Sequence, residues 1–527
     1  MTSRAPRAKE AASIRNGPSV SQSKPSGAPL VDAAKFVLAT RDSGYRSTAY
    51  AVAEFVDNSL QAGASSIAVD VVAGDDLPYP LELLIVDDGS GMDEITLASA
   101  LTFGGSTRFG DRSSLGRFGM GLPNGALSCA RRVEVFTWQR AGRSVLVSRL
   151  DVDEIAGRRR RTLPPVEAVS RPSFLPRTPH GTAVLLRRCD RLPYRRASTL
   201  AGKLHEELGR IYRRFIEGGT DLRVMGEPVE AIDPLLLKLN GRGPGGRLFG
   251  ERLAYLLESS GRRGKIEVRF AELPVDRWHD LSSEEKRRLG VTNAPCVSVM
   301  RAGREIDRGW FFMGGKRREN YDDWWRCEVS FEPVLDELFG ITNAKQGISP
   351  RPELSSALEP DLEPIARALN SRVRQRFEHV KATRPLGEAE RQAARADPAL
   401  PALPRRGDHL SESLRRLLAA HAELRDASSA PYQIVVDDLS TTAAFEVIRR
   451  RGQLVLVFNA RHPLYRDLYG PLAMSDSEAD QDVAKRVALA VLAAARAEAG
   501  ATRRGHREEV RRFRQAWADV LATFFTA

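Results

Sequence analysis

A mostly apolar run that ends in an acid and two glycines is the feature that most restricts the fold of this chain. Residues 81–92 read LELLIVDDGSGM, so Asp87 ends the run and Gly89 and Gly91 follow at D-x-G-x-G spacing. The run predicts a buried strand, and the glycines predict a tight turn, because glycine adopts positive φ angles without steric cost. The acid can be a simple turn residue. It can also be a carboxylate held in a pocket, where it accepts a hydrogen bond from an amine while the glycines let a ring approach the backbone.

Helices and strands alternate from residue 31 to about residue 190. Two strand patterns follow an opening helix, and three more come after a glycine-rich stretch; they are SSIAVDVVAG, LELLIVDDG, RRVEVFTWQR, RSVLVSRLDV and GTAVLLRRCD. Each amphipathic helix must bury its apolar stripe against another element. The order therefore predicts an α+β domain with helices stacked on one mixed sheet.

The opening helix, around AEFVDNSLQAGA at residues 53–64, carries two stripes. Apolar side chains at three- and four-residue spacing predict a core-facing stripe: Val52, Phe55, Val56 and Leu60. Polar side chains at i, i+3, i+4 and i+7 share another side: Glu54, Asp57, Asn58 and Gln61. A surface face in solvent is the ordinary interpretation of such a polar stripe. A polar site inside the domain is the alternative, and the segments downstream favour it.

A glycine-rich stretch, LTFGGSTRFGDRSSLGRFGMGLPNGALSCA, occupies residues 101–130. Its last part predicts a helix that begins at Pro123, because proline suits the first turn of a helix. Free N–H groups and the helix dipole at such a start attract anions, phosphate above all. Ser106, Thr107 and Arg108 precede this loop and make a phosphate site a stronger prediction.

Taken in order, these segments and HGTAVLLRR at residues 180–188 resemble the Bergerat ATP-binding fold of the GHKL superfamily, which includes gyrase, the heat-shock chaperone, histidine kinases and MutL. The resemblance covers about residues 35–190. Within the superfamily, AEFVDNSLQAGA with GRFGMGLPNGAL is most similar to the MORC-type branch. The resemblance implies an α/β sandwich that binds ATP and Mg²⁺.

The resemblance also implies roles for individual side chains. Glu54 is expected to be the general base that orients and deprotonates the attacking water, and Asn58 to hold Mg²⁺ through its amide oxygen. Asp57 is expected to contact ribose or bound waters, or to support Asn58. Asp87 is expected to accept a hydrogen bond from the adenine amino group, and Thr182 to bind near the same edge, partly through water.

Backbone groups complete the expected nucleotide site. The base is expected to lie against the turn formed by Gly89, Gly91 and Met92. The phosphates are expected to lie in the glycine loop, with contacts from Ser106, Thr107, Gly116, Gly119, Met120, Gly121 and Leu122. Residues 104–121 are expected to form a lid that becomes ordered on binding. Carboxylates grouped this closely repel unless a cation lies among them, which is a physical reason for Mg²⁺ beyond the resemblance.

A second α/β block is predicted over residues 201–385, after a first domain at 31–200. It resembles the transducer (ribosomal S5-type) domain of GHKL ATPases that hydrolyse ATP. FGITNAKQGISP, at residues 339–350, resembles the switch loop of that domain, and Lys345 is expected to contact the γ-phosphate and to couple ATP to a domain rotation. A solvent-exposed loop lysine is the alternative.

The remaining segments are less specific. Residues 1–30 are basic and rich in serine, proline and alanine, which predicts a disordered tail. Residues 386–410 predict a linker, and residues 411–527 a smaller mixed C-terminal region with short strands and two final helices. Arginines on the final helix predict a solvated face. For this region, a dimerisation or partner module and an ordinary structural domain are equally open.

Composition limits the setting of the chain. Its four cysteines lie far apart without paired metal spacing, which argues against disulfides and zinc and favours a reducing cytoplasm. No apolar run reaches about 18 residues, so no membrane span is predicted. The net charge of +12 permits nucleic-acid binding without requiring it.

These features predict a Mg²⁺-dependent ATPase that works as an ATP-gated clamp. ATP is expected to close the lid and bring two chains together as a homodimer, with DNA as the client in genome maintenance or phage defence. A chaperone-like ATPase that remodels proteins and a slow ATP sensor are the alternatives. A histidine autokinase is disfavoured, because the first histidine, His180, lies inside the predicted ATP domain.

Overall fold

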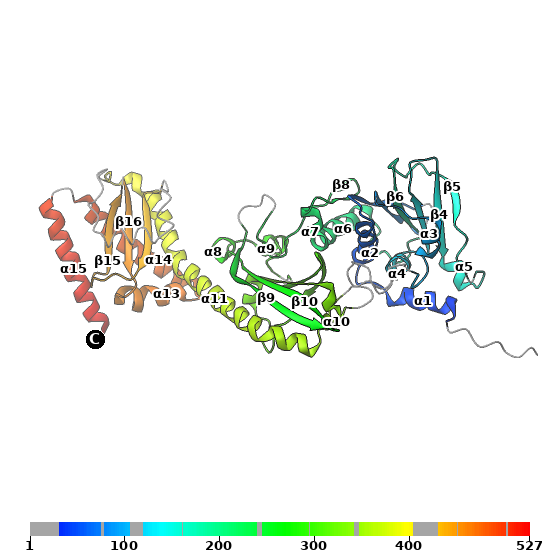
Figure 1. Ribbon diagram of the computed structural model, residues 1–527. Helices are drawn as coiled ribbons and strands as arrows, with labels where there is room; N and C mark the ends of the chain where they lie inside the picture. The colour runs from blue at the N-terminus through cyan, green and yellow to red at the C-terminus, as the bar shows by residue number, and fades with distance from the viewer. Residues whose placement is uncertain are drawn as a thin grey trace, which may run out of the picture. The chain divides into compact units, whose positions relative to one another are not determined.

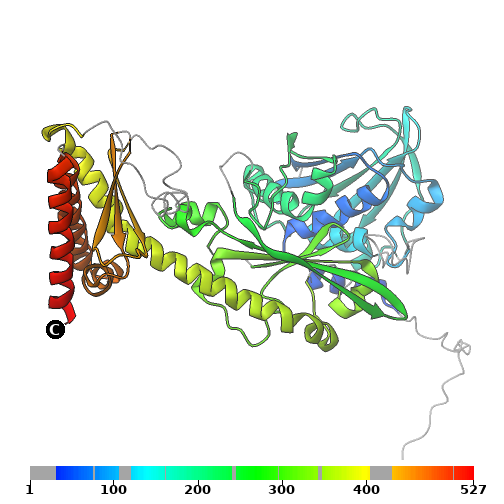
Figure 2. The same cartoon turned by 60° about the vertical axis from the view of Figure 1, so that its left-hand side comes forward.

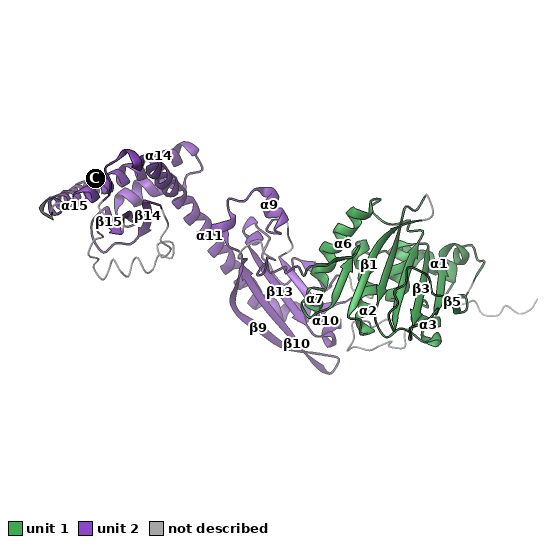
Figure 3. Ribbon diagram, turned by 90° about the horizontal axis from the view of Figure 1, so that it is seen from above, with its two compact units in different colours: residues 1–231, 342–346 green, residues 232–341, 347–527 purple. Residues whose placement is uncertain are grey.

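The computed structural model describes residues 31–74, 78–105, 120–160, 162–239, 245–292, 294, 296–341, 347–403, 430–450, 452–501 and 504–526 (Figure 1). The chain divides into two compact units (Figure 3). Unit 1 comprises residues 1–231 with 342–346, and unit 2 comprises residues 232–341 with 347–527. The predicted N-terminal tail lies outside the described residues. So does the segment SESLRRLLAAHAELRDA at residues 411–427, whose pattern is typical of a helix.

Unit 1 is built on an eight-stranded mixed sheet in the order β5-β4-β3-β6-β2-β1-β7-β8. The strands are β1 (Ser66–Ala73), β2 (Leu81–Asp87), β3 (Arg132–Trp138), β4 (Ser144–Asp151), β5 (Glu167–Ser170), β6 (Gly181–Arg187), β7 (Asp221–Val224) and β8 (Glu227–Pro228). Neighbouring strands run antiparallel except β1 and β7, which run parallel. The predicted mixed sheet is confirmed. The short strands β5, β7 and β8 were not predicted.

Strand β2 is buried along its whole length. Leu83 and Ile85 belong to the core on one face of the sheet, and Leu84 and Val86 to the core on the other. Two covered faces explain why this strand reads as an almost continuous apolar run instead of alternating with polar residues.

The helices of unit 1 are α1 (Ala33–Ser43), α2 (Thr48–Gln61), α3 (Glu94–Ala100), α4 (Gly121–Cys129), α5 (Val152–Ala156), α6 (Ala197–Ile211) and α7 (Arg213–Glu217). Residues of α1, α2, α4 and α6 form one hydrophobic core with the sheet, which confirms the predicted stacking of helices on a mixed sheet. Helix α4 begins at Gly121, two residues before the predicted start. Pro123 still lies in the first turn, where its missing N–H is harmless.

The first sheet of unit 2 has five strands in the order β12-β11-β13-β10-β9. These are β9 (Arg247–Ser259), β10 (Arg262–Glu272), β11 (Val297–Arg301), β12 (Arg304–Gly309) and β13 (Trp325–Phe331). Short helices α8 (Val275–Trp278) and α9 (Ser283–Arg288) lie between β10 and β11, and α10 (Asp336–Phe339) follows β13. The glycine-rich stretch GRGPGGRLFG at residues 241–250 is typical of a loop. Strand β9 nevertheless begins within it, at Arg247, because its backbone pairs with β10.

Helix α11 (Pro352–Ala396) is common to both cores of unit 2 (yellow-green in Figure 2). Its first half packs on the five-stranded sheet through an apolar row: Leu354, Leu358, Leu362, Ala366 and Leu369. Leu386 and Ala389 belong to the core of the C-terminal region. The helix continues to Ala396, so the first residues of the segment predicted as a linker, 386–410, are helical.

The C-terminal region has a three-stranded sheet in the order β14-β16-β15, with strands β14 (Tyr432–Asp437), β15 (Phe445–Arg450) and β16 (Gln453–Asn459). Helices α13 (Gly470–Met474), α14 (Glu478–Gly500) and α15 (Arg504–Thr526) follow. The predicted short strands and two final long helices are therefore present. In the described part of the chain, every helix is too short or too polar to cross a membrane.

Candidate nucleotide-binding site

The polar stripe of α2 faces the interior of unit 1. Glu54 is 2% exposed and Asp57 is 0% exposed, while Asn58 and Gln61 are half-buried. A surface face in solvent is therefore the wrong interpretation of this stripe. Because carboxylates are rarely buried without a partner or a function, the placement needs a specific explanation for each acid.

Asp87 lies at the end of β2, 8% exposed, among three hydrogen-bond donors. Its Oδ1 accepts from the backbone N–H of Gly89 at 2.9 Å and of Thr182 at 3.2 Å. Its Oδ2 accepts from the hydroxyl of Ser59 on α2 at 2.7 Å. The carboxylate is thus held in one orientation by α2, by the turn after β2 and by the first residues of β6.

Three neighbouring strands bring Asp87 and Thr182 together, as the sequence predicted for one edge of the site. Asp87 pairs with Thr182, and Thr182 pairs with Thr137 near the end of β3. The Thr137 hydroxyl lies 3.4 Å from the hydroxyl of Thr182, donates to the carbonyl of Gly181 at 3.1 Å and accepts from the N–H of Met92 at 2.8 Å. These contacts make a short row of polar groups at one end of the sheet.

Gly91 has a packing role in this structure besides the predicted contact with a base. Its φ is +67°, and a Cβ there would overlap the carbonyl oxygen of Trp138. A Cβ on Gly181 would in turn overlap the carbonyl oxygen of Asp87. Close backbone approach between the turn after β2 and the ends of β3 and β6 therefore requires glycine.

The two adjacent acids of the turn have opposite pKa shifts. Burial raises the pKa of Asp87 above its usual value, and the hydrogen bonds from Ser59, Gly89 and Thr182 offset only part of this effect. Burial also acts on Asp88, but hydrogen bonds from Ser65 and Ser66 outweigh it and hold the pKa of Asp88 below its usual value. Asp88 thus fastens β1 to the turn, whereas Asp87 is the desolvated acid.

Glu54 lies against the first turn of α4. A Cβ on Gly121 would overlap Glu54 Oε2, and a Cβ on Gly125 would lie 3.0 Å from the carbonyl oxygen of Ala51. These two glycines therefore let α4 approach α2 closely. The buried carboxylate sits near the N-terminal end of a nine-residue helix, where the helix dipole favours negative charge.

Residues 45–182 match the family described as histidine kinase-, DNA gyrase B- and HSP90-like ATPase, and this range includes Glu54, Asp87, the start of α4 and Thr182. The chain carries a GHKL-type ATPase domain. Such a domain implies that the chain binds ATP.

Distant relatives agree with this assignment. The chain is 35% identical over 88 residues to ATPase MORC2A of Mus musculus and to ATPase MORC2 of Homo sapiens, and 32% identical over 88 residues to ATPase MORC2B of Mus musculus. The alignments with the first two cover 16% of this chain and 8% of each relative. The sequence similarity therefore covers only a small part of each of those relatives.

Within the ATPase domain, Glu54 lies against α4, whereas Asp57 contacts Tyr212 after α6. Its Oδ1 accepts from the hydroxyl of Tyr212 at 2.7 Å, and the same hydroxyl lies 2.6 Å from the carbonyl oxygen of Ala53. Tyr212 follows α6 and is 1% exposed. The structure thus gives Asp57 a contact that ties α2 to the end of α6. Its predicted contact with ribose or bound water stays a prediction.

Asn58 is the residue predicted to hold Mg²⁺. Its side-chain amide makes no hydrogen bond with any residue that the structure describes, so its oxygen can serve as a ligand. Over the same described ranges, no group of three His, Cys, Asp or Glu side chains could hold a metal ion. An amide oxygen together with water and phosphate oxygens would suit Mg²⁺, which prefers oxygen ligands and keeps several waters.

Other predicted contacts can be located only in part. Met120 precedes α4 and Leu122 lies in its first turn, where it packs against the core with Met92. The remaining predicted residues lie outside the described residues: Ser106, Thr107, Gly116, Gly119 and Lys345. Their predicted roles stay predictions.

Sequence reasoning missed three residues that shape the ATPase domain: Ser59, Thr137 and Tyr212. Ser59 follows Asn58 on α2 and donates to Asp87, but a lone serine in a helix has no pattern that marks it. Thr137 lies on a strand among apolar residues, and only the pairing of β3 with β6 shows that it lies beside Thr182. Tyr212 is separated from Asp57 by 155 residues, so only the fold brings them together.

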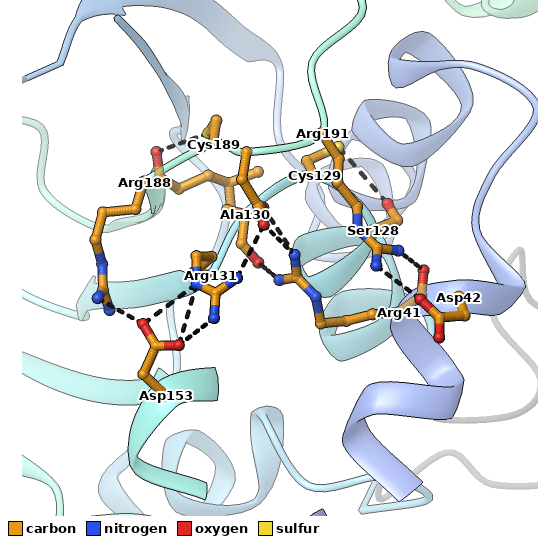
Figure 4. A network of polar contacts seen from close by, with 12 residues as sticks. Arg41, Asp42, Ser128, Cys129, Ala130, Arg131, Asp153, Arg188, Cys189 and Arg191 are labelled. Carbon is orange, nitrogen blue, oxygen red and sulfur yellow. Dashed lines mark hydrogen bonds and ion pairs between the residues drawn. The ribbon is translucent and has the colours of Figure 1, made fainter. Parts of the chain in front are cut away.

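The opposite ends of strands β3 and β6 carry a network of charged side chains (Figure 4). Arg41 of α1, 2% exposed, donates to both carboxylate oxygens of Asp190 at 2.7 Å and to the carbonyl oxygen of Ala130 at 2.6 Å. Arg131 bridges Asp190 and Asp153. This network fastens α1 to the ends of the strands, at the far end of β3 and β6 from Asp87.

Proposed function

We propose that this chain hydrolyses ATP with Mg²⁺ bound and that Glu54 activates the attacking water. The observation that carries the proposal is a buried carboxylate beside the first turn of α4. A buried carboxylate can accept a proton from a water molecule, and free N–H groups at a helix start favour phosphate oxygens. The water oxygen bonds to the γ-phosphorus, the bond from that phosphorus to the β–γ bridging oxygen breaks, and Glu54 receives the proton of the water.

Asp87 and Thr182 are proposed to select adenine. An oriented carboxylate at 8% exposure is a strong acceptor for an exocyclic amino group, because no bulk water competes for it. Asn58 would hold Mg²⁺, whose charge would neutralise the phosphates. Thr137, through its contacts with Met92 and Gly181, holds the neighbouring ends of β3, β6 and β2 in position.

Phosphate release by wild type and a Glu54→Gln variant tests the proposed chemistry. The variant keeps the shape of the side chain and removes its basicity, so we expect at least a hundredfold loss of turnover with ATP binding retained. Glu94→Gln is the matched control, because Glu94 is exposed at the start of α3 and should leave turnover unchanged. Equal turnover in Glu54→Gln and wild type would refute the assignment of the base.

We also propose that nucleotide binding gates a clamp on DNA, with two chains meeting when ATP is bound. The net charge of +12 supports a polyanionic client. Lys345 is proposed to sense the γ-phosphate and to couple it to unit 2. The test is the ATPase rate with and without duplex DNA at several salt concentrations: stimulation that falls steeply with salt is expected. A rate that DNA leaves unchanged at low salt would contradict the clamp on DNA while leaving the ATPase proposal standing.

A further inference from the structure

The segment between β5 and β6, residues 171–180, packs against the face of the unit 1 sheet opposite α2; we call it the strap. Leu175 is buried in the hydrophobic core on that face. Arg171 places its guanidinium carbon 4.5 Å from the ring centroid of Trp138 and donates to the carbonyl oxygen of Pro176 at 2.6 Å. The strap is therefore held to the sheet by an apolar anchor and by a cation over an aromatic ring.

The last residue of the strap, His180, has its backbone fixed on both sides. Before it, the buried Trp138 donates from Nε1 to the carbonyl oxygen of Thr178 at 3.0 Å, and the Thr178 hydroxyl donates to the carbonyl oxygen of His180 at 2.9 Å. After it, Gly181 lies so close to Trp138 that a Cβ there would be 2.7 Å from Cζ2 of the ring. These contacts hold His180 beside the end of β6.

From this place the imidazole of His180 reaches the turn that follows β2. Its Nδ1 lies 2.7 Å from the carbonyl oxygen of Gly89. Because a carbonyl oxygen can only accept, Nδ1 carries the hydrogen and donates it. The N–H of the same Gly89 donates to Asp87 Oδ1 at 2.9 Å, and so does the N–H of Thr182 at 3.2 Å. Gly89 is thus held through its N–H by Asp87 and through its carbonyl by His180.

We infer that His180 is a positioning residue for nucleotide binding, which fixes the turn after β2 so that the Asp87 carboxylate faces the adenine. Gly89 and Gly91 give this turn more backbone freedom than other residues would, so fixing it on binding costs conformational entropy. A hydrogen bond already made to Gly89 without ATP removes part of this cost and strengthens binding. The inference rests on the proposed adenine site and adds to it a residue that the base itself does not need to touch.

Three substitutions at His180 test which ring nitrogen matters. His180→Ala removes the donor, His180→Asn places an amide N–H at the position of Nδ1, and His180→Gln places one at the position of Nε2. Calorimetry with ATP in the full chain should show a Kd raised about three- to tenfold in His180→Ala and His180→Gln, the effect of one ordinary hydrogen bond. His180→Asn should restore the wild-type Kd. The kcat for phosphate release at saturating ATP should stay unchanged in all three, because the proposed base, Glu54, is untouched.

Base selectivity separates positioning from a general loss of structure. The preference for ATP over GTP, as the ratio of their Kd values, should narrow in His180→Ala, whereas a loss of folded protein would weaken both nucleotides equally. His379→Ala is the matched control, because His379 is exposed on α11 in unit 2; its Kd for ATP should equal that of wild type. An unchanged Kd in His180→Ala, or an equal rise in His180→Asn, would overturn the inference and leave the adenine site standing. A wild type that binds no ATP would overturn both.

Discussion

Replacing Asp87 by asparagine should separate nucleotide binding from stability. Asparagine can keep the Oδ1 acceptor for the N–H groups of Gly89 and Thr182. The Ser59 hydroxyl, which now donates to Oδ2, also lies 3.1 Å from the carbonyl oxygen of Phe55 and can donate there instead. The variant also removes a buried charge. We therefore expect the free energy of unfolding to change by less than about 1 kcal/mol.

The same change should weaken ATP binding strongly. The adenine amino group would meet the Nδ2 amino group in place of a carboxylate oxygen, so a charge-assisted hydrogen bond is lost. Such a bond contributes about 1.5–3 kcal/mol, which corresponds to a roughly 10- to 150-fold rise in Kd. Isothermal titration calorimetry with ATP measures the Kd, and thermal melting of the same samples measures stability.

Asp88→Asn is the matched control one residue away. Asp88 accepts hydrogen bonds from Ser65 and Ser66, whereas Asp87 accepts one from Thr182, so this variant should lose stability and keep the wild-type Kd. The pH dependence also differs in sign. The raised pKa of Asp87 means that its contribution to stability is present at low pH and is lost as the pH rises through its folded pKa. The lowered pKa of Asp88 means that its contribution is present above its unfolded pKa and is lost as the pH falls through its folded pKa.

Denaturant unfolding between pH about 3 and about 7 checks these signs. Relative to wild type, Asp87→Asn should gain stability as the pH rises, and Asp88→Asn should lose it. The reasoning is refuted if Asp87→Asn binds ATP as tightly as wild type, or if the two variants raise the Kd equally.

Three further variants test single contacts. Gly121→Ala forces the Glu54 carboxylate to move, so turnover should fall at least tenfold while the melting temperature changes little; a normal rate would contradict the packing. Tyr212→Phe removes the hydroxyl that donates to buried Asp57, so denaturant unfolding should show a loss of about 1–3 kcal/mol, and no loss would contradict its role. Arg41→Ala should lower the free energy of unfolding by about 3 kcal/mol in the same assay. An unchanged free energy would show that the network in Figure 4 contributes little to stability.

The sequence predicted those parts of the site that depend on local pattern. An apolar run ending in acid and glycines predicted a buried strand with Asp87 at its end, and the glycine loop predicted the helix start beside which Glu54 lies. The spacing on α2 predicted a shared face but not its burial, because periodicity is the same for a buried and a solvated stripe.

Contacts between distant segments could not be predicted in this way. Ser59, Thr137 and Tyr212 act through partners 28 to 155 residues away, and local spacing contains no information on such pairs. On α15 the many arginines predicted a solvated polar face, so the exposed apolar residues Phe513 and Phe524 were not singled out. Only the exposed fractions of Phe513 and Phe524 reveal that this face is apolar and without cover among the described residues.

The central claim is that one end of the unit 1 sheet, with Asp87, Glu54 and Asn58, surrounds a magnesium-bound ATP molecule. Titration of ATP with Mg²⁺ into the Glu54→Gln chain tests it most directly, because this variant should bind nucleotide without consuming it. We predict saturable heat with one ATP per chain, and much weaker heat when Asp87→Asn is added. No heat at millimolar nucleotide from a folded chain would contradict the claim.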